Sequence, residues 1–275
     1  MGSFGRLANR APDIDVPVMV KLAELNKSAK DAMPLGQGAV YWQPPGQALE
    51  KVKQIAWEIS SSRYGTHEGL PELREALVEK LCQENKLSKS SVMVTAGSNQ
   101  GFLNLVLALC HVVDSVVLFA PYFFNAYMSF KMTGINNILV GPSDPMTLLP
   151  DADWLEKTLS ETKPVPKLVS IVNPGNPSGT CIPEPLLKKQ DVNGSEVKSK
   201  ALPETKNSLV RPFHLFEVVC WFARRHGVLL LPGFACGTSG CIRITYGMLT
   251  ESECNVAAKR HERGGRAHQR GHGGE

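Results

Sequence analysis

Short apolar runs alternate along the chain with segments whose apolar residues recur every three or four positions. The runs predict strands at residues 91–95, 115–119, 137–140 and 168–172. Segments 100–111 and 125–132 lie between the runs and show helical periodicity. Alternation of strands and helices predicts an α/β fold, with a mostly parallel sheet covered by helices on both faces.

The same pattern divides the chain into parts. Helices are expected at 18–33, 47–60 and 70–81, and Pro71 suits the first turn of the last of these. After residue 212 a helix at 213–225 and strands at 227–231 and 241–246 are expected. The predicted parts are an N-terminal arm with part of a small domain (1–45), an incomplete large domain (46–190), a loop (191–212), a C-terminal small-domain segment (213–256) and a disordered basic tail (257–275).

Composition narrows the possible environments. The 275 residues are 43% hydrophobic, which favours a packed globular core. No apolar run reaches the roughly 18 residues that a membrane span needs, so no membrane partner is expected. Seven scattered cysteines favour a reduced, cytoplasmic protein. Cys236 and Cys241 lack a second matching pair, so no metal site is expected.

The net charge of +4 is concentrated at the C-terminal end. Residues 257–275 hold five Lys or Arg against two Glu, so they carry three of the four excess charges. We expect this tail to be solvated and disordered, with no nucleic-acid partner. A basic tail rich in Gly and His is also compatible with binding a polyanion, which is the alternative interpretation.

Three loops follow predicted strands and carry candidate chemistry. Residues 172–180 read Val-Asn-Pro-Gly-Asn-Pro-Ser-Gly-Thr, which forces a turn at the carboxyl end of a buried strand, where α/β sheets bind ligands. Residues 95–100, Thr-Ala-Gly-Ser-Asn-Gln, join a strand to a helix N-terminus, which favours an anion. Residues 120–124, Ala-Pro-Tyr-Phe-Phe, follow the next strand, although aromatic residues there are also typical of a core.

The doubled Asn-Pro-x-Asn-Pro-x-Gly motif resembles the cofactor loop of the class I/II, fold-type I aminotransferases, which use pyridoxal 5'-phosphate (PLP). The resemblance implies that Asn176 donates a hydrogen bond to the phenolic oxygen of PLP and that Phe123 stacks on its ring. It also implies that the phosphate is held by Gly97, Ser98 and Asn99. Tyr64, in Tyr-x-x-x-x-Gly-x-x-x-Leu-Arg, would reach the cofactor phosphate of a partner subunit.

Two further matches concern the substrate. Gly38, in Leu-Gly-Gln-Gly, resembles the family's N-terminal glycine turn near the substrate carboxylate. Arg243 resembles the C-terminal arginine that binds this carboxylate, a role that suits a planar guanidinium; an arginine on an exposed strand face is the alternative. The nearest resemblance is to plant-type aromatic aminotransferases. It implies aromatic or methionine-type amino acids and 2-oxo acids as substrates, and a large domain that binds PLP.

The family's catalytic segment is missing. Neither the Schiff-base lysine motif Ser-x-x-Lys with its Gly-rich continuation nor the strand aspartate that pairs with the pyridinium is found. Ser195-Glu-Val-Lys198 fits by letters alone, within a polar loop, and no strand precedes Asp191. Relative to the family, the spacing from Asn176 to Arg243 is short by roughly 120 residues, the size of a small domain.

These features lead to two hypotheses of different classes. The first is a PLP-dependent aminotransferase of fold type I that is internally truncated, impaired in catalysis and weak or deficient in PLP binding. The second is a non-catalytic isoform that pairs with or regulates an intact aminotransferase. The resemblance implies a homodimer, or a heterodimer with an intact paralogue.

Overall fold

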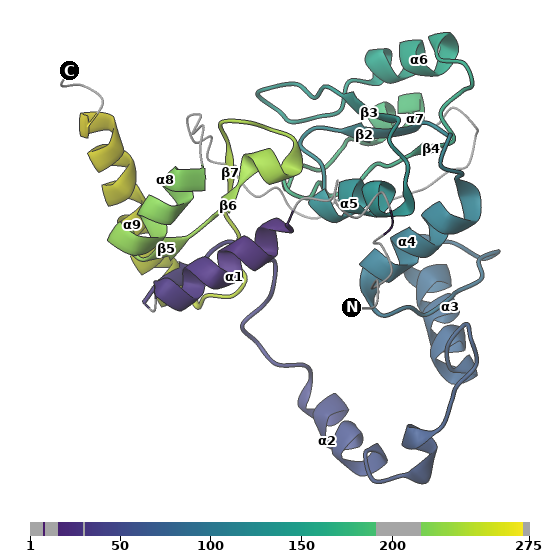
Figure 1. Ribbon diagram of the computed structural model, residues 1–275. Coiled ribbons are helices and arrows are strands. Elements are labelled where there is room, and N and C mark those ends of the chain that lie inside the picture. The colour runs from purple at the N-terminus through teal and green to yellow at the C-terminus, as the bar shows by residue number, and fades with distance from the viewer. Residues whose placement is uncertain (1–7, 9–15, 30, 191–215, 272–275) are drawn as a thin grey trace, which may run out of the picture. The chain divides into compact units, whose positions relative to one another are not determined.

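The computed structural model describes residues 8, 16–29, 31–190 and 216–271. The chain forms two compact units, each with its own strands (Figure 1). Each unit also has its own buried residues. The larger unit contains the described residues from 50 to 190. The smaller unit combines the described residues of 15–49 with those after 208.

The larger unit is built on three parallel strands in the order β3-β2-β4 (Figure 1). Their bounds are Val116–Phe119 for β2, Ile138–Gly141 for β3 and Leu168–Val169 for β4. The central strand β2 is buried at every position, as expected for an apolar run between two layers of helices. Because the strands are parallel, their carboxyl ends meet at one edge of the sheet.

Three helices cover the two faces of this sheet, namely α4 (Gly97–Leu109), α5 (Phe124–Thr133) and α6 (Ala152–Glu161). Neighbouring residues of a strand point to opposite faces. Leu118 of β2 therefore packs in one cluster with Val106 of α4 and Phe130 of α5. Phe119 packs in a second cluster with Leu155 of α6. The predicted covering of both faces by helices is present.

The residues at 91–95 are predicted to form a strand, but none of the strands in the described part of the chain pairs with them. Two hydrogen bonds hold this segment instead. Nε of Arg74 donates to the carbonyl of Val92 at 2.7 Å, and the amide of Val94 donates to the carbonyl of Glu68 at 2.8 Å. A strand needs a neighbour to take its ladder hydrogen bonds, and this segment lacks one.

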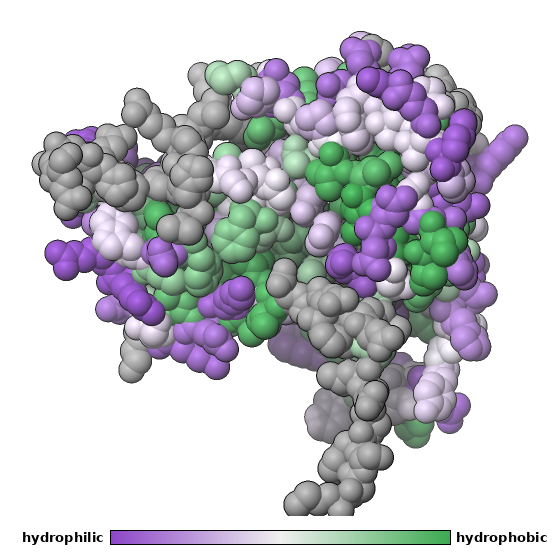
Figure 2. All heavy atoms as spheres, turned by 45° about the horizontal axis from the view of Figure 1, so that its top comes forward, coloured by the Kyte–Doolittle hydropathy of each residue, from purple (hydrophilic) through white to green (hydrophobic). Residues whose placement is uncertain are grey.

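Two helices that precede the sheet bury no residue. They are α2 (Gly46–Ile55), which crosses the boundary between the units, and α3 (Pro71–Asn85), with the 3₁₀ turn η1 (Ile59–Ser62) between them. Trp57 is 92% exposed, and Leu70 and Leu73 are exposed as well. Figure 2 also shows hydrophobic residues at the surface, between hydrophilic ones.

The smaller unit contains two pairs of short strands. The parallel pair is β1 (Met33–Pro34) with β5 (Val228–Leu229), and the antiparallel pair is β6 (Leu231–Pro232) with β7 (Ile242–Arg243). Its helical segments are α1 (Val18–Ser28), α8 (Phe216–Trp221), the π-helical turn η2 (Phe222–His226), the 3₁₀ turn η3 (Gly233–Cys236) and α9 (Glu251–Gly271). Leu22, Val219 and Phe222 are buried in this unit.

Helix α9 corrects the prediction of a disordered basic tail at 257–275, because residues 251–271 are helical. The helix begins with a capping box, in which the Thr250 amide donates to the Glu253 carboxylate at 2.7 Å and the Glu253 amide lies 3.4 Å from Oγ1 of Thr250. One helical face then packs on η2, where His261 stacks on Phe222 with ring centroids 5.4 Å apart and Gly264 is buried. Packing of this face compensates for the low helix propensity of the segment.

The last described element of the larger unit is α7 (Glu184–Gln190). The loop predicted at 191–212, including Asp191 and Lys198, lies outside the described residues. No helix in the described ranges combines the length and the apolar character that crossing a bilayer requires.

Candidate functional site

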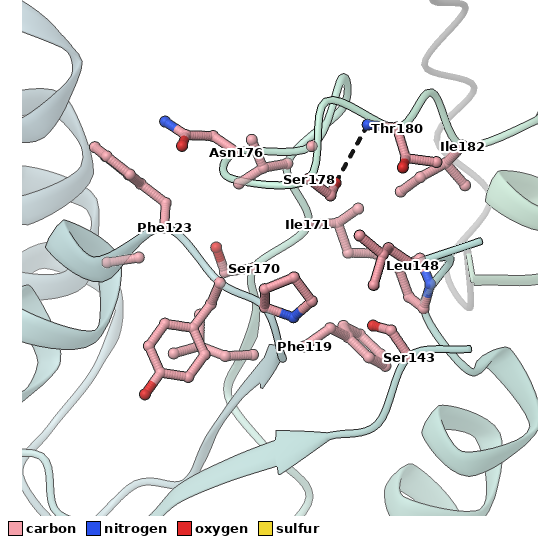
Figure 3. A pocket seen from close by; sticks show the side chains of 17 residues that line it. Phe119, Phe123, Ser143, Leu148, Ser170, Ile171, Asn176, Ser178, Thr180 and Ile182 are labelled. Atoms are coloured by element: carbon pink, nitrogen blue, oxygen red, sulfur yellow. Dashed lines mark hydrogen bonds between the residues drawn. The ribbon is translucent and has the colours of Figure 1, made fainter. Parts of the chain in front are cut away.

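A small cavity lies at the carboxyl edge of the parallel sheet (Figure 3). Its volume is about 40 Å³, and the loops after β2, β3 and β4 all contribute to its wall. The loop after β2 brings Phe123, and the loop after β4 brings Asn176. Sequence reasoning assigned these two residues to one site, and the structure places both on one cavity.

The Asn-Pro loop is closed by its own hydrogen bonds. The amide of Gly175 donates to the carbonyl of Thr180 at 2.8 Å. The side-chain oxygen of Asn173 accepts from the amide of Ile182 at 2.9 Å. The first asparagine of the motif therefore holds the loop, which leaves Asn176 at the cavity wall.

Phe123 is directed to the cavity by the start of helix α5. It occupies the N-cap position of that helix in an extended conformation. Its neighbour Tyr122 stacks on Tyr127, with centroids 5.3 Å apart and an interplanar angle of 10°. In Figure 3 the ring of Phe123 and the side chain of Asn176 lie at the same end of the cavity.

The loop after β3 is a part of the wall that no sequence motif indicated. It contributes Ser143 and Leu148. The available signal was topological: β3 is parallel to β2, so the loop after it meets the same sheet edge. Ser170, directly after β4, lines the cavity for the same reason.

Gly97, Ser98 and Asn99 form the first turn of α4, and they do not line this cavity. Gly97 has φ +80°, a conformation that favours glycine, and the three residues are exposed. The side chain of Gln100 accepts from the amide of Ala96 at 2.6 Å. The first turn of a helix has N–H groups without intrahelical acceptors, so this segment can bind an anion.

Tyr64 lies between η1 and α3 with its side chain fully exposed. It does not contribute to the cavity. The predicted contact of Tyr64 with a partner subunit therefore stays a hypothesis.

Gly38 and Arg243 belong to the smaller unit. Arg243 lies on β7, and its Nη2 donates to the carbonyl of Gly36 at 2.7 Å. Burial lowers the pKa of its guanidinium, which remains charged at neutral pH because the ordinary value is so high. In the glycine turn, the backbone packs closely at Gly36, where an added Cβ would lie 3.3 Å from the carbonyl carbon of Leu230. An added Cβ on Gly38 would meet no atom within 4 Å.

The cavity only partly fits PLP. An aromatic ring and an amide are present, but none of the described residues that line it is charged. Among the described residues, therefore, neither a lysine for a Schiff base nor an aspartate for the pyridinium reaches the cavity, and Lys198 lies outside the described residues. The volume of about 40 Å³ is also far below that of a small-molecule pocket, ~300 Å³ or more. No catalytic step through PLP follows from these residues.

Comparison with known proteins identifies the class. The family model "Aminotransferase class I and II" matches residues 30–190, more than half of the chain. The chain belongs to this family, and the predicted fold type is confirmed by solved aminotransferase structures. One of these, aspartate aminotransferase from Thermus thermophilus with maleate, has a TM-score of 0.59 at 25% identity and covers 68% of this chain and 50% of its own.

Among curated proteins, the chain is 60% identical over 189 residues to the aromatic aminotransferase ISS1 of Arabidopsis thaliana. The match covers 69% of this chain and 48% of the relative. The aspartate/prephenate aminotransferase of Thermus thermophilus is 28% identical, with 68% and 48% covered. The chain thus spans about half the length of the curated relatives it matches.

The family match bears unequally on the predicted site residues. Gly38, Tyr64, Phe123 and Asn176 lie within residues 30–190, as does the α4 N-terminus. Arg243 lies beyond the matched range, so its suggested role depends on the local Cys-Ile-Arg-Ile-Thr-Tyr-Gly sequence alone.

Proposed function

We propose that this chain retains part of the cofactor-recognition site of an aromatic aminotransferase and is impaired in amino-group transfer. The observation that carries the proposal is the cavity at the sheet edge, which Phe123 and Asn176 share and which no charged side chain of residues 31–190 or 216–271 lines. The 60% identity to an aromatic aminotransferase supports an aromatic amino acid as the substrate. A methionine-type amino acid is the other proposed substrate, and a 2-oxo acid is the proposed acceptor.

Each residue has a defined part in this proposal. Phe123 stacks on the pyridine ring, and the amide of Asn176 donates to the phenolic oxygen. The N–H groups at the start of α4 hold the phosphate, and Tyr64 reaches the phosphate of a partner subunit. When bound in a complete enzyme, PLP supplies an electron sink for the substrate carbon. Without the Schiff-base lysine of the family, the stacking, the amide hydrogen bond and the phosphate contacts hold PLP only weakly.

Arg243 and Gly38 are proposed to serve the substrate carboxylate. A guanidinium binds a carboxylate through two parallel hydrogen bonds, and burial strengthens such a pair. Arg243 already donates one hydrogen bond to Gly36, which orients its planar group beside the glycine turn.

Borohydride trapping tests the impairment. The full chain is incubated with PLP, reduced with borohydride and mapped by peptide mass spectrometry. We expect no stoichiometrically labelled lysine, because none of the lysines that the structure describes lines the cavity. A single labelled lysine at full occupancy, at Lys198 or elsewhere, would overturn the proposed impairment.

A PLP titration followed by protein fluorescence tests the recognition residues. Asn176→Ala should weaken PLP binding by about fivefold, since one hydrogen bond contributes about 1 kcal/mol. Asn137→Ala is the matched control, because Asn137 is exposed and precedes β3 at the opposite edge of the sheet. Equal affinities for the two variants would remove Asn176 from the site.

The second candidate is a non-catalytic isoform that pairs with an intact aminotransferase. It is favoured by α2 and α3, which bury no residue, and by Trp57 and Tyr64, whose side chains are almost completely exposed. Exposed apolar patches of this kind are typical of interaction surfaces. Co-expression with an intact aromatic aminotransferase should give a heterodimer that Trp57→Glu weakens and Lys51→Glu does not. Recovery of the intact enzyme only as a homodimer would exclude this function.

We also infer a cytosolic location, where thiols remain reduced. All seven cysteines are free, and Cys236 is buried. A fluorescent fusion found in a secretory compartment would contradict this inference.

A further inference from the structure

A second cavity, in the smaller unit, is lined by four arginines. Its volume is about 640 Å³, within the range of small-molecule sites. Arg224 and Arg225 come from η2, and Arg260 and Arg263 come from α9. Asp31 is the one acidic residue among the described residues of its lining. All of the arginines lie beyond residue 190, outside the range that the family model matches.

One of these arginines is fixed in place by the backbone. Nη1 of Arg260 donates to the carbonyls of Asp31 and Gly227, each at 3.2 Å. Gly227 ends η2 with φ +62°, and a Cβ there would lie 2.7 Å from that nitrogen. A glycine at this position therefore lets the guanidinium approach the end of η2, and the two hydrogen bonds join α9 to the β1 side of the cavity.

The other three arginines form no ion pair with a carboxylate within the described ranges, unlike Arg266, which pairs with Glu262 at 3.5 Å on the same helix. Like charges held near one another repel, and this repulsion disfavours the folded arrangement. A bound anion relieves it, and a guanidinium presents N–H groups that match the oxygens of a phosphate.

His226 adds a polar group to the same wall. It lines the cavity, and its Nε2 is buried without a hydrogen-bond partner in the part of the chain that the structure describes. Its ring lies against Trp221, with centroids 4.5 Å apart. Burial, and then the charge of Arg225, lower its pKa, so the ring is neutral at neutral pH and can accept or donate one hydrogen bond.

From this arrangement we propose that the cavity binds a small polyvalent phosphate anion, at a site separate from the sheet-edge cavity of the larger unit. Four guanidinium groups against one carboxylate exceed what a single monovalent anion neutralises, so a ligand with several phosphate groups fits better than chloride or a lone carboxylate. The guanidinium groups of Arg263, Arg224 and Arg225 contact the phosphate oxygens, and Arg260 holds α9 in position.

Isothermal titration calorimetry with inorganic tripolyphosphate, at constant ionic strength, tests this site on the full chain. We expect saturable binding with one anion per chain. Arg263→Gln should weaken it about tenfold, the effect of losing one charge-assisted contact. Arg266→Gln is the matched control, because this substitution removes the same charge from the same helix. Arg266 does not line the cavity.

Equal weakening by Arg263→Gln and Arg266→Gln would reduce the effect to net charge and overturn the proposal. Non-saturable binding of tripolyphosphate would overturn it too. So would a short oligonucleotide that binds more tightly than tripolyphosphate and is weakened equally by Arg263→Gln and Arg266→Gln. Hydrogen exchange on the unsubstituted chain gives an independent readout. Tripolyphosphate should slow exchange at 223–227 and 260–263 and leave the loop at 170–182 unchanged; protection of that loop alone would place the anion at the sheet-edge cavity instead.

Discussion

Gly264 and Gly265 are neighbours on helix α9, and the structure predicts opposite effects for the same substitution. A Cβ on Gly264 would lie 2.3 Å from Cε1 of Phe222, with two further ring carbons at 2.9 and 3.0 Å. Phe222 has no exposed surface, so its ring lacks free space to move into. A Cβ on Gly265 would meet nothing within 4 Å.

The changes in the free energy of unfolding can be compared directly, because both variants gain the same helix propensity. Replacing a helical glycine by alanine gains about 1 kcal/mol in helix propensity. Gly265→Ala should therefore stabilise the smaller unit by about 1 kcal/mol. Gly264→Ala gains the same term but adds overpacking against Phe222, which costs about 1–3 kcal/mol. The difference between the two variants, about 1–3 kcal/mol, measures the clash alone.

Urea unfolding followed by far-ultraviolet circular dichroism measures this difference. With a slope of about 1–3 kcal/mol/M, the two midpoints should differ by on the order of 1 M, with Gly265→Ala the more stable. If Gly264→Ala proved as stable as Gly265→Ala, α9 would not pack on Phe222 as described. The arginine-lined cavity would then lose one of its walls.

Three further variants test other parts of the fold. Asp151→Ala removes the N-cap of α6, where the Asp151 carboxylate accepts a hydrogen bond from the Trp154 amide at 2.9 Å. This change should lower the free energy of unfolding by about 1 kcal/mol, whereas the control Asp151→Asn retains a capping oxygen. Phe130→Ala empties a fully buried position between α5 and the sheet and should cost about 3–5 kcal/mol in urea unfolding, a loss below 1 kcal/mol being incompatible with its burial. Burial lowers the pKa of His261, so the unfolded state binds its proton more readily and the stability of the smaller unit should fall as the pH drops below about 6.5. His261→Phe keeps the stacking on Phe222 and should flatten that dependence; an unchanged pH slope would exclude His261 as its source.

Local sequence was sufficient for strands β2, β3 and β4 of the larger unit and for the loops after β2 and β4. The apolar run that became β2, the Asn-Pro loop and the aromatic pair at 122–123 each depend on neighbouring residues, through burial, turn chemistry and strand direction. The parallel order of the strands then brought Phe123 and Asn176 to one cavity. The capping box at Thr250 was equally readable from the sequence and would have indicated a helix in place of a disordered tail.

Contacts between distant segments were beyond the sequence pattern. Residues 91–95 have the composition of a strand, yet no partner strand takes their hydrogen bonds. Arg243 donates to Gly36, 207 positions away, and the arginine-lined cavity joins η2 and α9 to the segment around Asp31. Periodicity and turn chemistry are local properties, so the sequence by itself determined which segments are strands, helices and loops over most of the sheet. Which surfaces meet depends on complementary shape and on the positions of all other segments, and only the tertiary structure decided that Gly264 lies against Phe222 and that four arginines share one cavity.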